Sequence, residues 1–200
     1  MRIVELILDE ESMANGIDAI SIVSAPAIEE NFIALNSQQE YKFKTLNDEK
    51  RLLLGPALIP NKPIYRRNGE DEFYVFFSEN TIRKANELFF KRGNHTKATL
   101  EHEVNLQDTT IVESWLIEDP KMDKSNTYGY DLPKGTWMVA MKIDNDEIWN
   151  EYVKTQQVTG FSIEGYFADK LSDKTSMSKE QEAQKKIDAV KKIIVDALGI

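Results

Sequence analysis

The stretch that decides the fold class is residues 136–169, TWMVAMKIDNDEIWNEYVKTQQVTGFSIEGYFAD. Residues 136–143 are mostly apolar and predict a buried strand. Residues 144–155 carry acidic residues at their start, where the positive end of a helix dipole favours them, and predict a helix. Residues 159–169 return to a strand pattern that begins at Gly160. This strand, helix and strand complete a longer series of elements that begins near the N-terminus.

The segments before this stretch add further strands and one helix. Asn68 and Gly69 separate two strand-like runs and predict a hairpin, because Asn-Gly readily supplies the positive φ of a tight turn. Ser78 is a predicted N-cap for a helix that ends at Gly93. Residues 119–135 are rich in turn formers and predict an exposed loop. The remaining predicted strands are residues 2–8, 52–59, 97–104 and 109–119.

This order of elements is neither a regular alternation of strands and helices nor an all-helical pattern. It predicts an α+β fold in which a mostly antiparallel β-barrel core is surrounded by helices. We expect residues 1–50 to form an N-terminal strand and extension packing on the barrel, residues 51–170 the barrel domain, and residues 171–200 a polar linker and a C-terminal helix. That helix is predicted to be amphipathic, with one apolar face made of Ile187, Val190, Ile194, Ala197 and Leu198.

The composition excludes several classes of protein. The 200 residues contain no cysteine, which excludes a disulfide framework, a thiolate zinc site and a cysteine nucleophile. A formal net charge of -9 without a basic run disfavours binding to nucleic acid. The N-terminus turns acidic at Asp9, too soon for a signal peptide, and no apolar run approaches the roughly 20 residues that span a bilayer. We therefore expect a soluble intracellular protein without a membrane or nucleic-acid partner.

Two histidines are the candidate general bases. His102 lies in a segment predicted as a strand, where alternation puts it on the inward face with Leu100 and Val104. An imidazole on an inward face needs a hydrogen-bond partner, and this requirement fits an ordinary core histidine as well as a catalytic base. His95 follows a Gly-Asn turn and is the weaker candidate. The two histidines lack the spacing of a zinc motif, so neither a metal nor another cofactor is expected.

Ser162 is the candidate nucleophile, because Gly160 and Gly165 flank it and would let a substrate backbone approach its hydroxyl. The spacing differs from the Gly-x-Ser-x-Gly turn of the α/β-hydrolases, since the second glycine is one place late and no helix is predicted to follow. An ordinary strand serine is the commoner role for such a residue. A nucleophilic serine also needs a neighbouring base, for which His102 is the best candidate. Glu164 falls on the same predicted strand face as Ser162.

Four blocks of the chain carry a more specific pattern: Glu101-His102-Glu103, residues 112–115, residues 126–137 and residues 160–165. Together these blocks resemble the XkdF-like phage serine proteases, a prohead maturation protease group similar to the herpesvirus protease assemblin. Residues 19–32 look like the opening of the same phage proteins. The resemblance implies a closed β-barrel surrounded by helices, with His102 as the base and Ser162 as the nucleophile.

The resemblance leaves the third catalytic residue open. Relatives use an acid or a second histidine, often after the serine, and no histidine follows Ser162 here. Glu164 is favoured because it shares a strand face with Ser162, although the family usually has glycine at this position. The alternates are Glu113, on a strand that could neighbour His102, and Asp169, which has the family's chain order.

The function that the resemblance implies is maturation of a phage prohead. A serine endopeptidase of this kind cleaves scaffold protein, capsid protein and itself inside the assembling procapsid, in the cytoplasm of the bacterial host. Self-association is also compatible with the amphipathic C-terminal segment. The alternative is a non-catalytic capsid-assembly or scaffold-like protein that keeps the fold, which the same segment fits equally well. A hydrolase built on a pair of carboxylates is a third reading, but the sequence has no diagnostic spacing for one.

Overall fold

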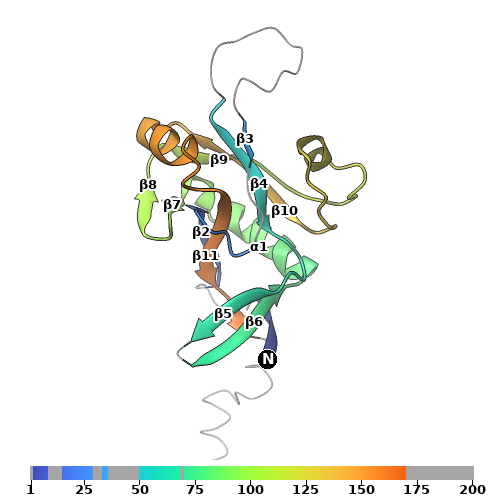
Figure 1. The fold of residues 1–200 in the computed structure, drawn as a ribbon. Coiled ribbons are helices and arrows are strands. Elements are labelled where there is room, and N and C mark those ends of the chain that lie inside the picture. The colour runs from blue at the N-terminus through green and yellow to red at the C-terminus, as the bar shows by residue number, and fades with distance from the viewer. Residues whose placement is uncertain (1, 9–14, 29–32, 36–49, 69, 170–200) are drawn as a thin grey trace, which may run out of the picture.

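The computed structural model describes the chain except for residues 1, 9–14, 29–32, 36–49, 69 and 170–200. The C-terminal amphipathic helix predicted within residues 171–200 therefore lies outside the described residues. In the described part the fold is α+β, with many strands and few helices (Figure 1). The predicted fold class is confirmed at this level.

The elements follow one another in mixed order along the chain. The helical elements are α1 (Glu79–Lys91), the short 3-10 helices η1 (Asn94–Thr96) and η2 (Lys124–Tyr128), and the π-helix η3 (Ile148–Val153). The strands are β1 (Arg2–Ile7), β2 (Gly16–Val23), β3 (Ile33–Leu35), β4 (Leu52–Leu58), β5 (Ile64–Asn68), β6 (Asp71–Phe77), β7 (Ala98–Leu100), β8 (Val104–Leu106), β9 (Thr109–Leu116), β10 (Trp137–Ile143), β11 (Gly160–Tyr166) and β12 (Ala168–Asp169).

The described strands pair into three four-stranded sheets. Their orders are β12-β1-β6-β5, β3-β4-β10-β9 and β11-β2-β7-β8. The β1–β6 and β2–β7 pairs are parallel, whereas the other pairs are antiparallel. Figure 1 shows the β5–β6 hairpin beside β1 at one end of the molecule and β11 beside β2 nearer its centre. No closed barrel is found among the described residues, so the barrel stays a prediction.

Large apolar side chains hold the sheets and α1 together. Phe89 of α1 and Trp137 of β10 are fully buried, and their rings meet edge to face with centroids 5.5 Å apart. Phe161 of β11 and Trp149 of η3 are also buried. Burying one such side chain contributes about 1.5–3 kcal/mol of stability. This common core fixes the position of β11, on which Ser162 lies.

Several local predictions are confirmed. Ser78 is the N-cap of α1, and its hydroxyl accepts the Thr81 N–H at 3.4 Å. The chain leaves α1 through Gly93, whose φ of 70° suits a residue without a Cβ. The hairpin around Asn68 pairs β5 with β6 in register. These elements formed as predicted because their signals are local.

The segment around His102 differs from its prediction. Residues 97–104 were expected to form one strand, but β7 ends at Leu100 and the chain turns back into β8. Glu101 and His102 have positive φ values of 51° and 62°, which cost roughly 1–2 kcal/mol each for residues with a Cβ. The expected inward face shared by His102, Leu100 and Val104 is therefore wrong. His102 lies in a tight turn, and Val104 is exposed.

Two further segments depart from simple expectation. Within the predicted helix 144–155, only residues 146–153 are helical, and most of that helix is the wider π form of η3. The segment 119–135 is largely exposed, yet it contains η2 and the buried Ser125 and Leu132. This segment is therefore an ordered connection rather than a simple exposed loop.

Candidate active site

A row of hydroxyl side chains crosses the sheet that contains β11. Ser162 of β11 pairs with Ser21 of β2, and Ser21 pairs with Thr99 of β7. Residues paired in register share one face of a sheet, whereas their chain neighbours point to the other face. The neighbours Phe161 and Ile22 are buried in the core. The sheet thus has an apolar core face and an opposite face that carries Ser162, Ser21 and Thr99.

Glu164 connects this row to His102. It lies two residues after Ser162 on β11 and therefore shares its face. Its Oε1 atom accepts the Thr99 hydroxyl and lies 3.1 Å from Nδ1 of His102. Because β2 separates β11 from β7, the Glu164 side chain reaches across β2 to make these contacts.

The His102–Glu164 pair remains accessible to solvent. The two side chains are 41% and 29% exposed, respectively. The tautomer that fits their contact carries the imidazole proton on Nδ1, which leaves the lone pair on Nε2 to accept another proton. The pair thus has the arrangement in which a carboxylate orients an imidazole base.

Ser162 is the neighbour of Glu164 on the same face of β11, two residues earlier in the chain. Alternate residues of a strand are about 6.7 Å apart, so the Cα atoms of Ser162 and Glu164 are separated by about that distance. Ser162 is partly exposed, whereas its neighbour across the strands, Ser21, is fully buried. Of the two serines in the row, Ser162 is the one that solvent reaches.

The other sequence candidates lie elsewhere. Glu113 is on β9 in a different sheet, where it forms an ion pair with Lys124. The backbone of Asp169 belongs to β12 and pairs with Leu6 of β1 in the third sheet. The structure does not bring Glu113 into contact with His102, whereas it does bring Glu164 there. The side chain of Asp169 lies outside the described part of the chain.

His95 has a different environment. It lies in η1, and its ring stacks on Phe90 with the centroids 6.0 Å apart and the planes 10° from parallel. Among the described residues, its Nδ1 atom is buried without a hydrogen-bond partner. Within that described part of the chain, no carboxylate contacts Nδ1 of this imidazole, which separates it from the His102 arrangement.

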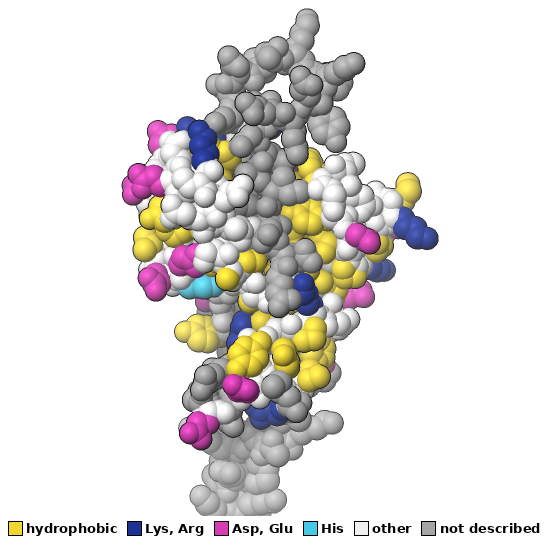
Figure 2. Space-filling model, viewed as in Figure 1, with side chains coloured by type: hydrophobic (Ala, Val, Ile, Leu, Met, Phe, Trp, Pro, Cys, Tyr) yellow, Lys and Arg dark blue, Asp and Glu magenta, His cyan; other side chains and the backbone are white. Residues whose placement is uncertain are grey.

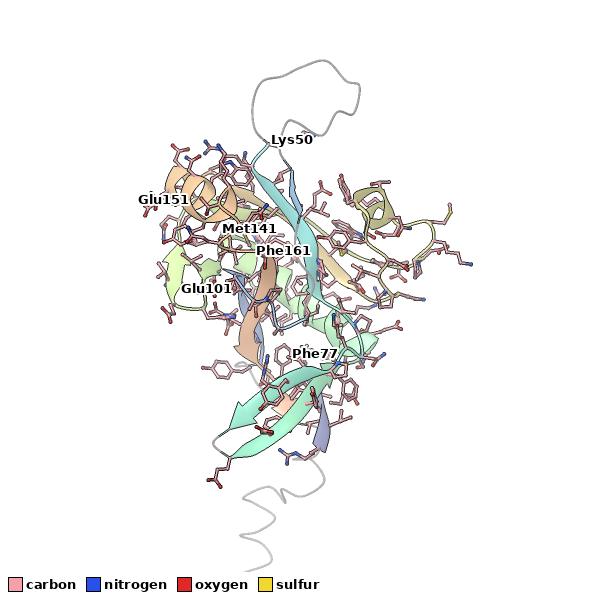
Figure 3. The ribbon with its side chains drawn as sticks, viewed as in Figure 1. Lys50, Phe77, Glu101, Met141, Glu151 and Phe161 are labelled. Atoms are coloured by element: carbon pink, nitrogen blue, oxygen red, sulfur yellow. The ribbon has the colours of Figure 1, made fainter. Side chains whose placement is uncertain are left out.

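Acidic side chains surround the candidate base. Glu101 and Glu103 flank His102 in the chain, and Glu101 accepts the Ser24 N–H at 2.6 Å. Figure 2 shows a surface histidine beside acidic side chains, in the part of the molecule where Figure 3 labels Glu101. Within the described residues, no group of three or more His, Cys, Asp or Glu side chains could hold a metal ion. None of the described helices is long and apolar enough to cross a membrane.

Sequence reasoning missed two residues of this site, Ser21 and Thr99. Ser21 interrupts the apolar run of residues 19–23, and this polar residue in an otherwise apolar strand was the available signal. Thr99 had no comparable signal, because threonine is common in strands. Their importance follows from the strand register, which brings distant segments together.

The described residues define a sheet-rich α+β protein with an exposed histidine–carboxylate pair beside a serine-bearing strand. A family model described as "Putative phage serine protease XkdF" matches residues 42–171. The chain therefore belongs to this family, and the resemblance of its sequence blocks is confirmed. No curated protein and no solved structure matches the chain. The matched residues include His102, Ser162 and Glu164, and the family supports a protease role.

Proposed function

We propose that this protein is a serine endopeptidase of prohead maturation, with Ser162 as nucleophile, His102 as general base and Glu164 as the acid that orients the base. The observation that carries the proposal is the 3.1 Å contact between Nδ1 of His102 and Oε1 of Glu164, made on the face of the sheet to which Ser162 belongs. Membership of a phage serine protease family supports the same chemistry.

The proposed reaction begins with proton transfer from Ser162 to His102. The Nε2 lone pair of His102 takes the hydroxyl proton as Oγ of Ser162 attacks the peptide carbonyl. The Glu164 carboxylate stabilises the resulting imidazolium through Nδ1–H. His102 then gives the proton to the leaving amine, and water hydrolyses the acyl-enzyme with the same base. Among the described residues no hydrogen bond joins Ser162 to His102, and contacts between a nucleophile and its base often form fully only when substrate binds.

The proposed substrates are proteins of the assembling procapsid. Phage scaffold protein, capsid protein and the enzyme's own polar segment 171–178 are the candidates. The site of action would then be the procapsid interior in the cytoplasm of the bacterial host. This assignment rests on the family and on the sequence, in which residues 171–178 are mostly polar.

Co-expression tests the proposal. The full chain is produced with the capsid and scaffold proteins of its phage, as wild type and as Ser162→Ala. We expect shortened capsid or scaffold bands with the wild type and full-length bands with the variant. Identical uncleaved bands from both chains, in samples where both are folded, would remove the peptidase assignment.

A non-catalytic assembly role is the second candidate function. Ile3, Tyr74 and Tyr65 form a cross-strand row over β1, β6 and β5, and the Ile3 and Tyr65 side chains are 60% and 46% exposed. Figure 2 shows hydrophobic side chains over this hairpin. Exposed apolar groups of this kind suit a protein contact. Assembly of normal proheads with uncleaved components would favour this role over hydrolysis.

A further inference from the structure

The buried hydroxyl of Ser21 contacts the candidate base directly. Its Oγ atom accepts the backbone N–H of His102 at 3.0 Å and donates to the carbonyl oxygen of Thr99 at 3.3 Å. Ser21 has no exposed surface. Both hydrogen-bonding roles of this hydroxyl are therefore occupied within the protein, and neither is directed at solvent or substrate.

The contact reaches a residue with a strained backbone. His102 has a φ of 62°, in the left-handed region that residues with a Cβ avoid. A hydrogen bond to its N–H favours this conformation over an extended one. The extended alternative would carry the imidazole away along the strand and separate it from Glu164.

The hydroxyl of Thr99 holds the other half of the pair. It donates to Oε1 of Glu164, the same oxygen that faces Nδ1 of His102. Thr99 is also buried and lies next to Ser21 across the strands. One hydroxyl thus fixes the backbone of the base, and its neighbour fixes the carboxylate that the base contacts.

We propose that Ser21 and Thr99 are positioning residues that set the orientation and tautomer of His102. Neither touches the reacting atoms. Their effect on catalysis rests on the proposed function, whereas their effect on the imidazole does not. A role limited to satisfying buried polar groups would leave the imidazole unchanged when the hydroxyls are removed and the fold is kept.

The chain allows a direct test because it contains two histidines. Nitrogen-15 chemical shifts distinguish the two neutral tautomers of each imidazole, and His95 serves as the internal control because it contacts Phe90 instead of this site. The variants are Ser21→Ala, Thr99→Val, which keeps the shape but removes the hydroxyl, and Thr99→Ser, which keeps the hydroxyl. Each is made in the full chain, and unfolding midpoints confirm that it is folded.

We expect wild-type His102 to carry its neutral proton on Nδ1. Ser21→Ala and Thr99→Val should each lose at least half of this tautomer, Thr99→Ser should keep it, and the His95 signals should not move. Wild-type tautomer ratios in both hydroxyl-free variants, or a wild-type proton on Nε2, would overturn the proposal. If Ser21→Ala does not fold, the comparison of the His102 tautomer in Thr99→Val and Thr99→Ser tests the proposal.

A kinetic measurement separates this proposal from the proposed function. In an active enzyme, Thr99→Val should lower kcat about 10²-fold, the scale of effect that a small displacement of catalytic groups produces, with KM unchanged. An inactive wild type that still shows the tautomer change would remove the peptidase assignment and keep the positioning role. An active Thr99→Val enzyme with wild-type kcat would overturn the positioning role and keep the peptidase.

Discussion

Ser21 and Ser162 face each other as direct partners on the neighbouring strands β2 and β11, yet Ser21 is fully buried and Ser162 is partly exposed. Both belong to one row of hydroxyl side chains that Thr99 completes. The difference in exposure gives the two serines different roles. Ser21 supports the turn that carries His102, whereas Ser162 is partly exposed to solvent.

Replacing each of the two serines by alanine should change activity in one case and stability in the other. Ser162→Ala should abolish cleavage and change the free energy of unfolding by less than about 0.5 kcal/mol, because no buried partner is lost. Ser21→Ala should lower the free energy of unfolding by about 1–2 kcal/mol, since buried groups lose a hydrogen bond. Chemical denaturation and a cleavage assay measure both effects. Equal destabilisation by the two changes would contradict the assigned positions.

Glu164→Gln should lower kcat about 10³–10⁴-fold with little change in KM. The amide keeps the shape of the side chain but no longer stabilises an imidazolium or selects its tautomer. Glu113→Gln is the matched control, because Glu113 lies on β9 of another sheet and forms its ion pair with Lys124 of η2. Steady-state kinetics on both variants check the prediction. A Glu164→Gln enzyme as active as the control would remove Glu164 from the site.

Gly165→Ala should disrupt the end of β11. A Cβ at this position would lie 2.0 Å from the backbone oxygen of Gly16, at the register shift that follows Glu164. Because both β11 and β2 are held in the sheet, a shift of either backbone is unfavourable, and we expect a loss of about 3 kcal/mol in the free energy of unfolding. Gly129→Ala is the control, since it meets no atom within 4 Å and carries only the conformational cost of its φ of 85°, about 1 kcal/mol. Comparable losses in both variants would contradict the close approach.

Asp123 should make the 119–135 segment sensitive to acid. Burial raises the pKa of Asp123, but hydrogen bonds from Ser125 and Trp115 outweigh burial and hold this pKa below its ordinary value. A carboxyl with a depressed folded pKa stabilises the fold above its unfolded pKa of about 3.9, and the contribution is lost as pH falls through the folded pKa.

Asp123→Ala should therefore lower the free energy of unfolding by about 1 kcal/mol near neutral pH. This loss of stability should become smaller in acid. Trp115 fluorescence during denaturation reports the change, because its Nε1–H donates to Asp123. Lys121→Ala, beside the same turn, serves as a control with little expected effect. A cost that is independent of pH would show that the carboxylate charge does not contribute.

Elements with local signals could be predicted from the sequence. The Ser78 cap, the Asn-Gly hairpin and the buried strand 137–143 each depend on residues close together in the chain. Ser162 and Glu164 also fall on one face as alternation predicts. For these features, the local preferences of the chain and its tertiary structure agree.

The turn at His102 could not be predicted in this way. No glycine or Asn-Gly pair marks it, and its positive φ values are held by partners far away in sequence, Ser21 and Ser24. The contact between His102 and Glu164 likewise depends on β2 lying between β7 and β11. The pairing of Ser162 with His102 as nucleophile and base stays a prediction, and the geometry that relates the two residues is set by sheet order and register.

His102 is proposed to activate Ser162, and covalent labelling tests this activation most directly. Diisopropyl fluorophosphate transfers its phosphoryl group to an activated serine and releases fluoride, and mass spectrometry locates the modified residue. We predict that Ser162 is labelled in the wild-type chain, that Ser21 is not, and that His102→Ala loses the label. An unlabelled Ser162 in the folded wild type, or equal labelling in His102→Ala, would contradict activation of Ser162 by His102.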